Sequence, residues 1–286
     1  TTPAFSWSIG LQYAANNNKV LDLQGAEFVD MPGAFAGAPG AAVLGSRVGV
    51  LRGNDFARCG RGLLIGGLDI DALCGPNAPR GALFIGQDGF PILDPTVRVI
   101  MDPHPDWTGS LRTDFTFGRN WQLSALFDTR QGNEVWNGTR GALYQFGTHK
   151  DTEIRGQQRA FGSPGFHQGP VAGPGAGTPV TIDQAWFQGL GSGFGPVASQ
   201  FVEDGSFVKL REVAVTYDAN WGWIQRSLGV ENLRIRLAGR NLVTWTDYSG
   251  IDPETNLGGA EVNLLGVDYF NNPATRTFVL TLGFNR

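Results

Sequence analysis

Carboxylate and imidazole side chains stand at alternate positions in the stretch MDPHPDW, as the ligands of a metal ion could. These side chains are Asp102, His104 and Asp106. Two prolines stiffen the same stretch just before a strand pattern begins, and a rigid turn explains the spacing without a metal. We therefore predict a turn here and no metal site.

Oxygen-bearing side chains also gather in two other stretches, as they do in calcium-binding loops. LDID contains Asp69 and Asp71, and DPETN contains Asp252, Glu254 and Asn256. Neither stretch has the full spacing of an EF-hand loop. We predict solvated turns in extracellular loops, with calcium as the alternative, and we expect no other cofactor.

Nucleophilic catalysis has little support in this chain. The motifs Gly-x-Ser-x-Gly and the phosphate loop are missing, and GLGSGFG at 189–195 lacks dinucleotide-binding spacing, so we predict a flexible loop there. All three histidines fall in predicted loops or turns: His104, His149 and His167. We expect no enzyme. A secreted glycan-active enzyme is the alternative, because two carboxylates distant in sequence can meet in a cleft.

The two cysteines, Cys59 and Cys74, lie in a glycine-rich stretch. We predict a disulfide formed in an oxidising envelope compartment, with two unpaired thiols as the alternative. A net charge of −4 gives no reason to expect a nucleic acid partner. The opening TTPAFSWSIG lacks the basic and apolar regions of a signal peptide, so we expect a processed chain or a fragment.

The elements that position these residues are expected to be β-strands. Glycine makes up 42 of 286 residues, which favours many turns and an all-β fold. Apolar and polar residues alternate with a period of two, as on a strand. About seven stretches show this pattern: 5–13, 20–25, 109–118, 121–130, 206–218, 233–240 and 275–284. The first two are predicted to form a hairpin through a tight turn around Asn16–Lys19.

The alternation changes phase within 206–218. Val208 and Leu210 occupy even positions, whereas Val213 and Val215 occupy odd ones. One extra residue near Arg211–Glu212 would restore a single apolar face, so we predict a β-bulge there.

The connections between the strand patterns differ strongly in length. Some are short, and three are very long, over about 28–105, 132–204 and 246–273. Short turns at one end and long loops at the other are typical of an outer-membrane β-barrel, and the strand lengths fit a tilted membrane span. Aromatic residues near strand ends fit interfacial girdles: Trp7, Tyr13, Trp121, Tyr217 and Trp245. Seven strands would leave open edges in lipid, so the chain is expected to be one portion of a larger barrel.

Three stretches resemble the C-terminal part of SusC/RagA family TonB-dependent outer-membrane transporters. They are PDWTGSLRTDFTFGRNWQLSALFDTRQGNEVWNGT, FVEDGSFVKLREVAVTYD and RNLVTWTDYSGIDPE, at 105–139, 201–218 and 240–254. In the second, Lys209 stands where the family more usually has arginine. The stretches follow the family's order up to its C-terminus.

The resemblance implies that residues 1–286 are the C-terminal part of a twenty-two-stranded transmembrane barrel in the bacterial outer membrane, with long extracellular loops. It implies import of oligosaccharides or peptides, with a SusD-like surface lipoprotein and with TonB as partners. The plug domain and the TonB-contact segment of the family are not found in this chain. A siderophore or vitamin receptor of the TonB-dependent type is the first alternative, and a structural or surface-assembly β-protein is the second.

The barrel prediction gives each strand face a role. The aliphatic face, with Leu233, Ile235 and Leu237, is expected to meet lipid acyl chains. The polar face is expected to line an aqueous lumen, where charged residues either contact the plug or solute or are simply hydrated. The lumen candidates are Arg112, Asp114, Arg234, Arg236 and Arg240. Loop aromatics are expected to stack on sugars, to face a lid protein or to pack the loops together: Trp136, Trp186, Trp245, Tyr248 and Tyr269.

Overall fold

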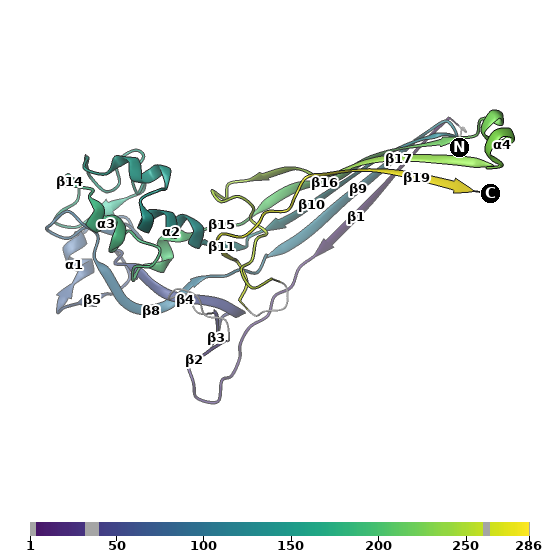
Figure 1. Cartoon of the computed structure of the whole chain (residues 1–286). Coiled ribbons are helices and arrows are strands. Elements are labelled where there is room, and N and C mark those ends of the chain that lie inside the picture. The colour runs from purple at the N-terminus through teal and green to yellow at the C-terminus, as the bar shows by residue number, and fades with distance from the viewer. Residues whose placement is uncertain (1–3, 32–39, 260–263, 286) are drawn as a thin grey trace.

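A computed structural model describes residues 4–31, 40–259 and 264–285. A six-stranded antiparallel sheet dominates it, in the order β1-β9-β10-β16-β17-β19. The bounds of these strands are β1 Phe5–Ala14, β9 Trp107–Phe117, β10 Trp121–Gln131, β16 Phe207–Ala219, β17 Asn232–Thr246 and β19 Thr277–Asn285. Figure 1 shows this sheet as a long blade that projects from a globular body.

All long connections leave the sheet at one end. At the other end, β9 meets β10 through residues 118–120, and β16 meets β17 through a segment that contains helix α4, Gly222–Leu228. The long connections cover 15–106, 132–206 and 247–276, and we call their described residues the loop unit. The start of β1 and the end of β19 lie at the α4 end (Figure 1). The predicted asymmetry of the connections is therefore present.

The predicted hairpin at the start of the chain is wrong. Residues 15–23 form no strand, and β1 pairs instead with β9, from Phe5 opposite Phe117 to Ala14 opposite Thr108. A ten-residue register with a matching apolar face outweighs a short run such as VLDLQG. Val20 is buried in the loop unit, where its amide donates to the carbonyl of Ser46.

The predicted β-bulge is confirmed at Arg211. Leu210 pairs with Phe127, while Glu212 pairs with Leu126, so Arg211 is the extra residue on β16. The strand beside it is also irregular here, between Arg240 and Val243 of β17. The bulge returns the apolar positions of β16 to one face.

The loop unit has a core of its own, which the sequence did not reveal. Each long connection contributes at least one strand to it and the first two also contribute short helices, and buried apolar residues from all three connections pack together, including Leu51, Trp136 and Val267. Its strands are β2 Phe28–Asp30, β3 Gly40–Val43, β4 Val48–Phe56, β5 Leu64–Ile65, β6 Leu68–Asp69, β7 Leu83–Phe84, β8 Leu93–Met101, β11 Glu134–Asn137, β12 Gln158–Arg159, β13 Val171–Ala172, β14 Val180–Thr181, β15 Val202–Asp204 and β18 Val267–Asp268. Its helices are α1 Ile70–Cys74, α2 Gly138–Phe146 and α3 Gln184–Gln188, with 3-10 turns η1 Lys150–Ile154 and η2 Ala198–Phe201.

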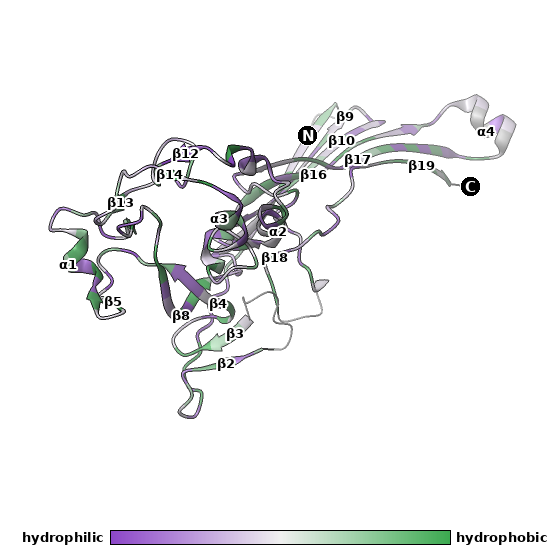
Figure 2. Cartoon of the chain, turned by 60° about the vertical axis from the view of Figure 1, so that its left-hand side comes forward, coloured by the Kyte–Doolittle hydropathy of each residue, from purple (hydrophilic) through white to green (hydrophobic). Residues whose placement is uncertain are grey.

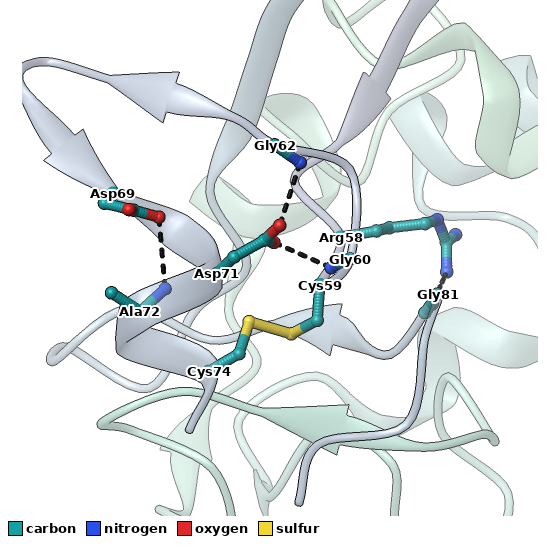
Figure 3. The surroundings of a disulfide bond; sticks show 9 residues. All are labelled: Arg58, Cys59, Gly60, Gly62, Asp69, Asp71, Ala72, Cys74 and Gly81. Carbon is teal, nitrogen blue, oxygen red and sulfur yellow. Dashed lines mark hydrogen bonds between the residues drawn. A yellow bond between two sulfur atoms is a disulfide. The ribbon is translucent and has the colours of Figure 1, made fainter. Parts of the chain in front are cut away.

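Cys59 and Cys74 form a disulfide in the loop unit. It joins the end of α1 to the segment after β4, and Asp71 on the same helix accepts hydrogen bonds from the amides of Gly60 and Gly62 (Figure 3). Asp69 caps the first turn of α1 by accepting from the Ala72 amide. Both carboxylates of LDID therefore bind backbone amides of their own loop.

The glycine-rich segment 189–195, predicted as a flexible loop, packs closely against α2. A Cβ on Gly193 would lie 2.3 Å from the Cα of Gly141, so only two glycines permit this approach. Ser192, directly before Gly193, is fully buried, and its hydroxyl donates to Gln145. The glycines therefore allow close packing against α2, and they do not indicate a flexible loop.

Candidate functional site

The two faces of the sheet differ sharply in chemistry. Aligned across the strands, one row reads Trp7, Phe115, Leu123, Val215, Leu237 and Leu280. We call this side the apolar face and the opposite side the polar face. Hydropathy alternates along β16 and β17 accordingly (Figure 2).

The apolar face is uncovered in the described part of the chain. Leu11 is 77% exposed, Phe278 is 71% exposed and Leu280 is 63% exposed. Leu233 and Ile235 are half-buried by their strand neighbours, and Leu237 is exposed. Within residues 4–31, 40–259 and 264–285 no second sheet covers this row, which distinguishes the blade from a β-sandwich.

The arginines named as lumen candidates lie on the polar face in ion pairs. Arg236 and Arg240 both donate to Glu212, and Arg234 donates to Asp218. Arg112 pairs with Asp114 two residues along its own strand, at 3.0 Å. The polar face thus carries fixed, largely balanced charges, with a shallow hollow of hydroxyl and amide side chains between Arg112 and Arg236.

The bulge shapes this polar face. Because Arg211 is the extra residue, both it and Glu212 reach the charged side chains of the polar face. Arg211 donates to Asp128 on β10 and to Glu254 in the loop unit. One irregular residue therefore connects two strands and a loop.

Lys209 forms the centre of this junction between blade and loop unit. Its Nζ is 2.7 Å from an oxygen of Asp252 and 2.6 Å from an oxygen of Glu254, and the lysine is buried. Burial disfavours the ionised form of Glu254, but hydrogen bonds from Arg211 and Lys209 outweigh it and lower its pKa to about 2. The DPETN carboxylates, candidates for calcium, thus bind cationic side chains, and Asp252 also accepts from the Ala274 amide.

A second junction joins all three motif stretches through Glu203. Its carboxylate accepts hydrogen bonds from Arg140, from Asn137 and from both the amide and the hydroxyl of Ser249. Tyr248, beside that serine, is buried and donates to Asp268 on β18 at 2.7 Å. These contacts hold the segment after β17 against α2 and β11.

The loop aromatics do not form one surface. Trp136 is buried and donates its indole hydrogen to the Ala198 carbonyl, and Trp186 is buried against Phe56 and Phe90. Tyr269 is half-buried. Trp245 is not in a loop at all, because it lies on β17 and is half-exposed on the apolar face. Trp136, Trp186 and Tyr248 therefore pack the loops together, which was one of the roles expected for them.

The MDPHPDW residues form a turn with ion pairs. Arg47 contacts both Asp102 and Asp106, and the His104 amide and ring both approach Asp102. In the described part of the chain, no three His, Cys, Asp or Glu side chains gather as metal ligands would.

A small cavity inside the loop unit was not foreseen from the sequence. Arg140, Tyr144, Asp151 and His167 line it. Tyr144 donates to Asp151, which Arg140 also contacts at 3.0 Å. Burial of His167 among aromatic rings lowers its pKa to about 4, so its imidazole is neutral at physiological pH. Sequence could not bring these residues together, because they come from α2, η1 and a separate loop.

The whole chain is similar to parts of known proteins. No family model matches the chain. Two curated proteins of Formosa agariphila are similar to it: TonB-dependent receptor P3 is 27% identical over 298 residues, and TonB-dependent receptor P26 is 28% identical over 288 residues. The matches cover 100% and 99% of this chain but only 27% of each relative, so the chain spans about a quarter of their length.

Solved structures of the RagAB peptide importer share the fold. The open-open state matches with a TM-score of 0.60 at 15% identity, and the closed-closed state with a TM-score of 0.54 at 14% identity. They cover 99–100% of this chain and 27–28% of the matched chain. The solved structures confirm the all-β barrel fold class, and together with the two relatives they confirm the resemblance to part of a SusC/RagA-like TonB-dependent transporter. No helix in the described ranges is long and apolar enough to cross a membrane.

Proposed function

We propose that this chain forms part of the barrel wall of a TonB-dependent importer in the bacterial outer membrane. The observation that carries the proposal is the apolar face, which runs unbroken over six strands and has no covering layer in the described residues. Water is a poor solvent for so large an apolar surface, whereas acyl chains match it.

The dimensions of the apolar face fit a membrane. Trp107 and Tyr13 stack at the loop end of the sheet, and Trp121 and Tyr217 contact each other with tilted rings at the other end. The strand β9 runs from one row to the other, because it begins at Trp107 and ends at Phe117, the partner of Trp121; its eleven residues make about ten steps along the strand. With a rise of roughly 3.3 Å per residue and a tilt of about 40°, they give a height of about 25 Å, which matches the apolar band of outer-membrane barrels.

The two edges of the sheet support a larger assembly. Among the described residues, β1 pairs only with β9, and β19 pairs only with β17. Open edges in lipid cost several kcal/mol per unpaired group, so both edges are assigned to the remainder of the barrel. The plug and the segment that contacts TonB belong to that remainder, since this chain matches only a quarter of each relative.

The cargo we propose is an oligosaccharide or peptide, taken up with a SusD-like surface lipoprotein. The loop unit lies at the end of the blade where the extracellular loops belong, and its compact core gives a lipoprotein a firm surface to meet. The balanced ion pairs of the polar face suit a hydrated neutral or zwitterionic solute better than a strongly charged one. No covalent chemistry is required.

Uptake by living cells tests this function. A strain that lacks the full-length gene should lose uptake of labelled oligosaccharides or of labelled peptides, and the intact gene should restore it. The same gene without its TonB-contact segment should not. Loss of siderophore or vitamin uptake alone would favour the other receptor class, and unchanged uptake of all four would contradict the proposal.

A further inference from the structure

Four aromatic side chains form a continuous row at the end of the blade with the short connections. Their ring centroids lie 4.6 Å apart from Trp121 to Tyr217, 5.9 Å from Tyr217 to Trp221 and 6.0 Å from Trp221 to Trp223. We call these four residues the aromatic ladder. It begins on the sheet and ends on α4.

The ladder starts on the apolar face. Trp121 pairs with Phe117 on one side and with Tyr217 on the other, in a register that belongs to the apolar face. The contact from Tyr217 to Trp221 therefore brings the start of α4 to the side of the sheet that carries the exposed apolar row. Figure 1 shows α4 just beyond the strand ends.

The three tryptophan rings of the ladder are exposed to solvent. Trp121 is 50% exposed, Trp221 is 44% exposed and Trp223 is 57% exposed. An indole has an apolar body and one polar N–H group, which suits the boundary between acyl chains and headgroups. Arg226 on α4 and Arg119 in the neighbouring turn are exposed cations at the same end, and cations suit phosphate headgroups.

We propose that α4 and the aromatic ladder dock on the phospholipid headgroup layer of the periplasmic leaflet. The inference rests on the proposed function, because it needs the apolar face to meet lipid. It goes further by giving a short connection between strands a membrane contact of its own. Continuity with the apolar face favours lipid over a periplasmic protein, since any occupant of the ladder must also border the acyl chains beside Phe117.

Lipid-borne quenchers of tryptophan fluorescence test the proposal in the full-length transporter. The protein is reconstituted in two kinds of phosphatidylcholine vesicle, one with a nitroxide on the headgroup and one with bromine near the middle of the acyl chain. The emission of Trp221 and Trp223 is obtained as the difference between the wild type and a Trp221→Phe/Trp223→Phe variant. Ile9→Trp is the matched control, because Ile9 lies near mid-height on the apolar face and is half-exposed.

The headgroup label should quench the emission of Trp221 and Trp223, which we call the ladder emission, roughly twofold more than the acyl label does. The order should reverse for the indole added at Ile9. Quenching of the Ile9→Trp indole together with no quenching of the ladder by either lipid would overturn this inference and leave the proposed function intact. Stronger quenching of the ladder by the acyl label would also overturn it. No quenching at either place would contradict the proposed function itself. Heat-modifiable migration on gels confirms that each variant is folded.

Discussion

Lys209 shows how a single buried charge can connect a barrel wall to its loops. Its ammonium group is enclosed by Asp252 and Glu254, which lie more than forty positions along the chain. The resemblance drew attention to both stretches, because Lys209 and the DPE sequence lie in separate motifs. It did not show that the motifs bind each other, since the contact exists only once β16 and the segment after β17 are folded together.

Replacing Lys209 with methionine should loosen the segment 247–259. The change leaves a buried carboxylate without its partner, which typically costs about 3–5 kcal/mol. Hydrogen exchange of that segment in the folded protein measures the loss of its local stability. The double variant Lys209→Met/Asp252→Asn should cost clearly less than the sum of the single changes, and strict additivity would contradict the pairing.

His167 should make the loop unit sensitive to acid. The unfolded chain binds a proton on this residue near pH 6.5, whereas the folded loop unit resists it until about pH 4. The contribution of His167 to the stability of the loop unit is therefore fully present above pH 6.5. It is lost as the pH falls from 6.5 to about 4, and the loss reaches about 3 kcal/mol. Hydrogen exchange of residues 158–170, corrected for intrinsic rates, should show the fall in the wild type and little of it in His167→Phe. An equal fall in both proteins would assign it to other groups.

At the scale of elements, the strands with strict alternation were predictable and the loop unit was not. Periodicity located the six strands of the blade and the bulge in β16, because each leaves a local pattern. The run at 20–25 gave a wrong prediction for the same reason. It is locally strand-like, but β1, its predicted partner, pairs with the longer β9 instead. The core of the loop unit draws on three distant connections, so no local pattern could reveal it.

The bulge offers a sharp test at this scale. Deleting Arg211 should move Val208 and Leu210 to the polar face, because a shift of one residue exchanges the two faces of a strand. We expect the full-length protein to lose most of its folded, heat-modifiable form on gels. Arg211→Ala keeps the residue count and removes only ion pairs, so it should still assemble. Assembly of the deletion at the level of Arg211→Ala would show that the bulge does not set the phase.

At the scale of the whole molecule, the arrangement is an open blade with a folded cap at one end. The connection lengths predicted that the long loops gather at one end of the strands, and Figure 1 shows them there. Everything proposed about import depends on the apolar face meeting lipid and the polar face meeting water. The chain supplies adjacent residues on these two faces of β1, Ser8 and Ile9, whose strand partners are Asp114 and Thr113.

The most direct measurement compares Ile9→Arg with Ser8→Arg in the full-length protein folded into lipid vesicles. An arginine near mid-height on a lipid-facing side should lower the free energy of unfolding by about 2–4 kcal/mol, while one on a water-filled side should change it little. Urea unfolding, followed by heat-modifiable migration, gives both values. A large loss for Ile9→Arg with a small one for Ser8→Arg is the predicted result. Equal losses, or a greater loss for Ser8→Arg, would contradict the assignment of the faces.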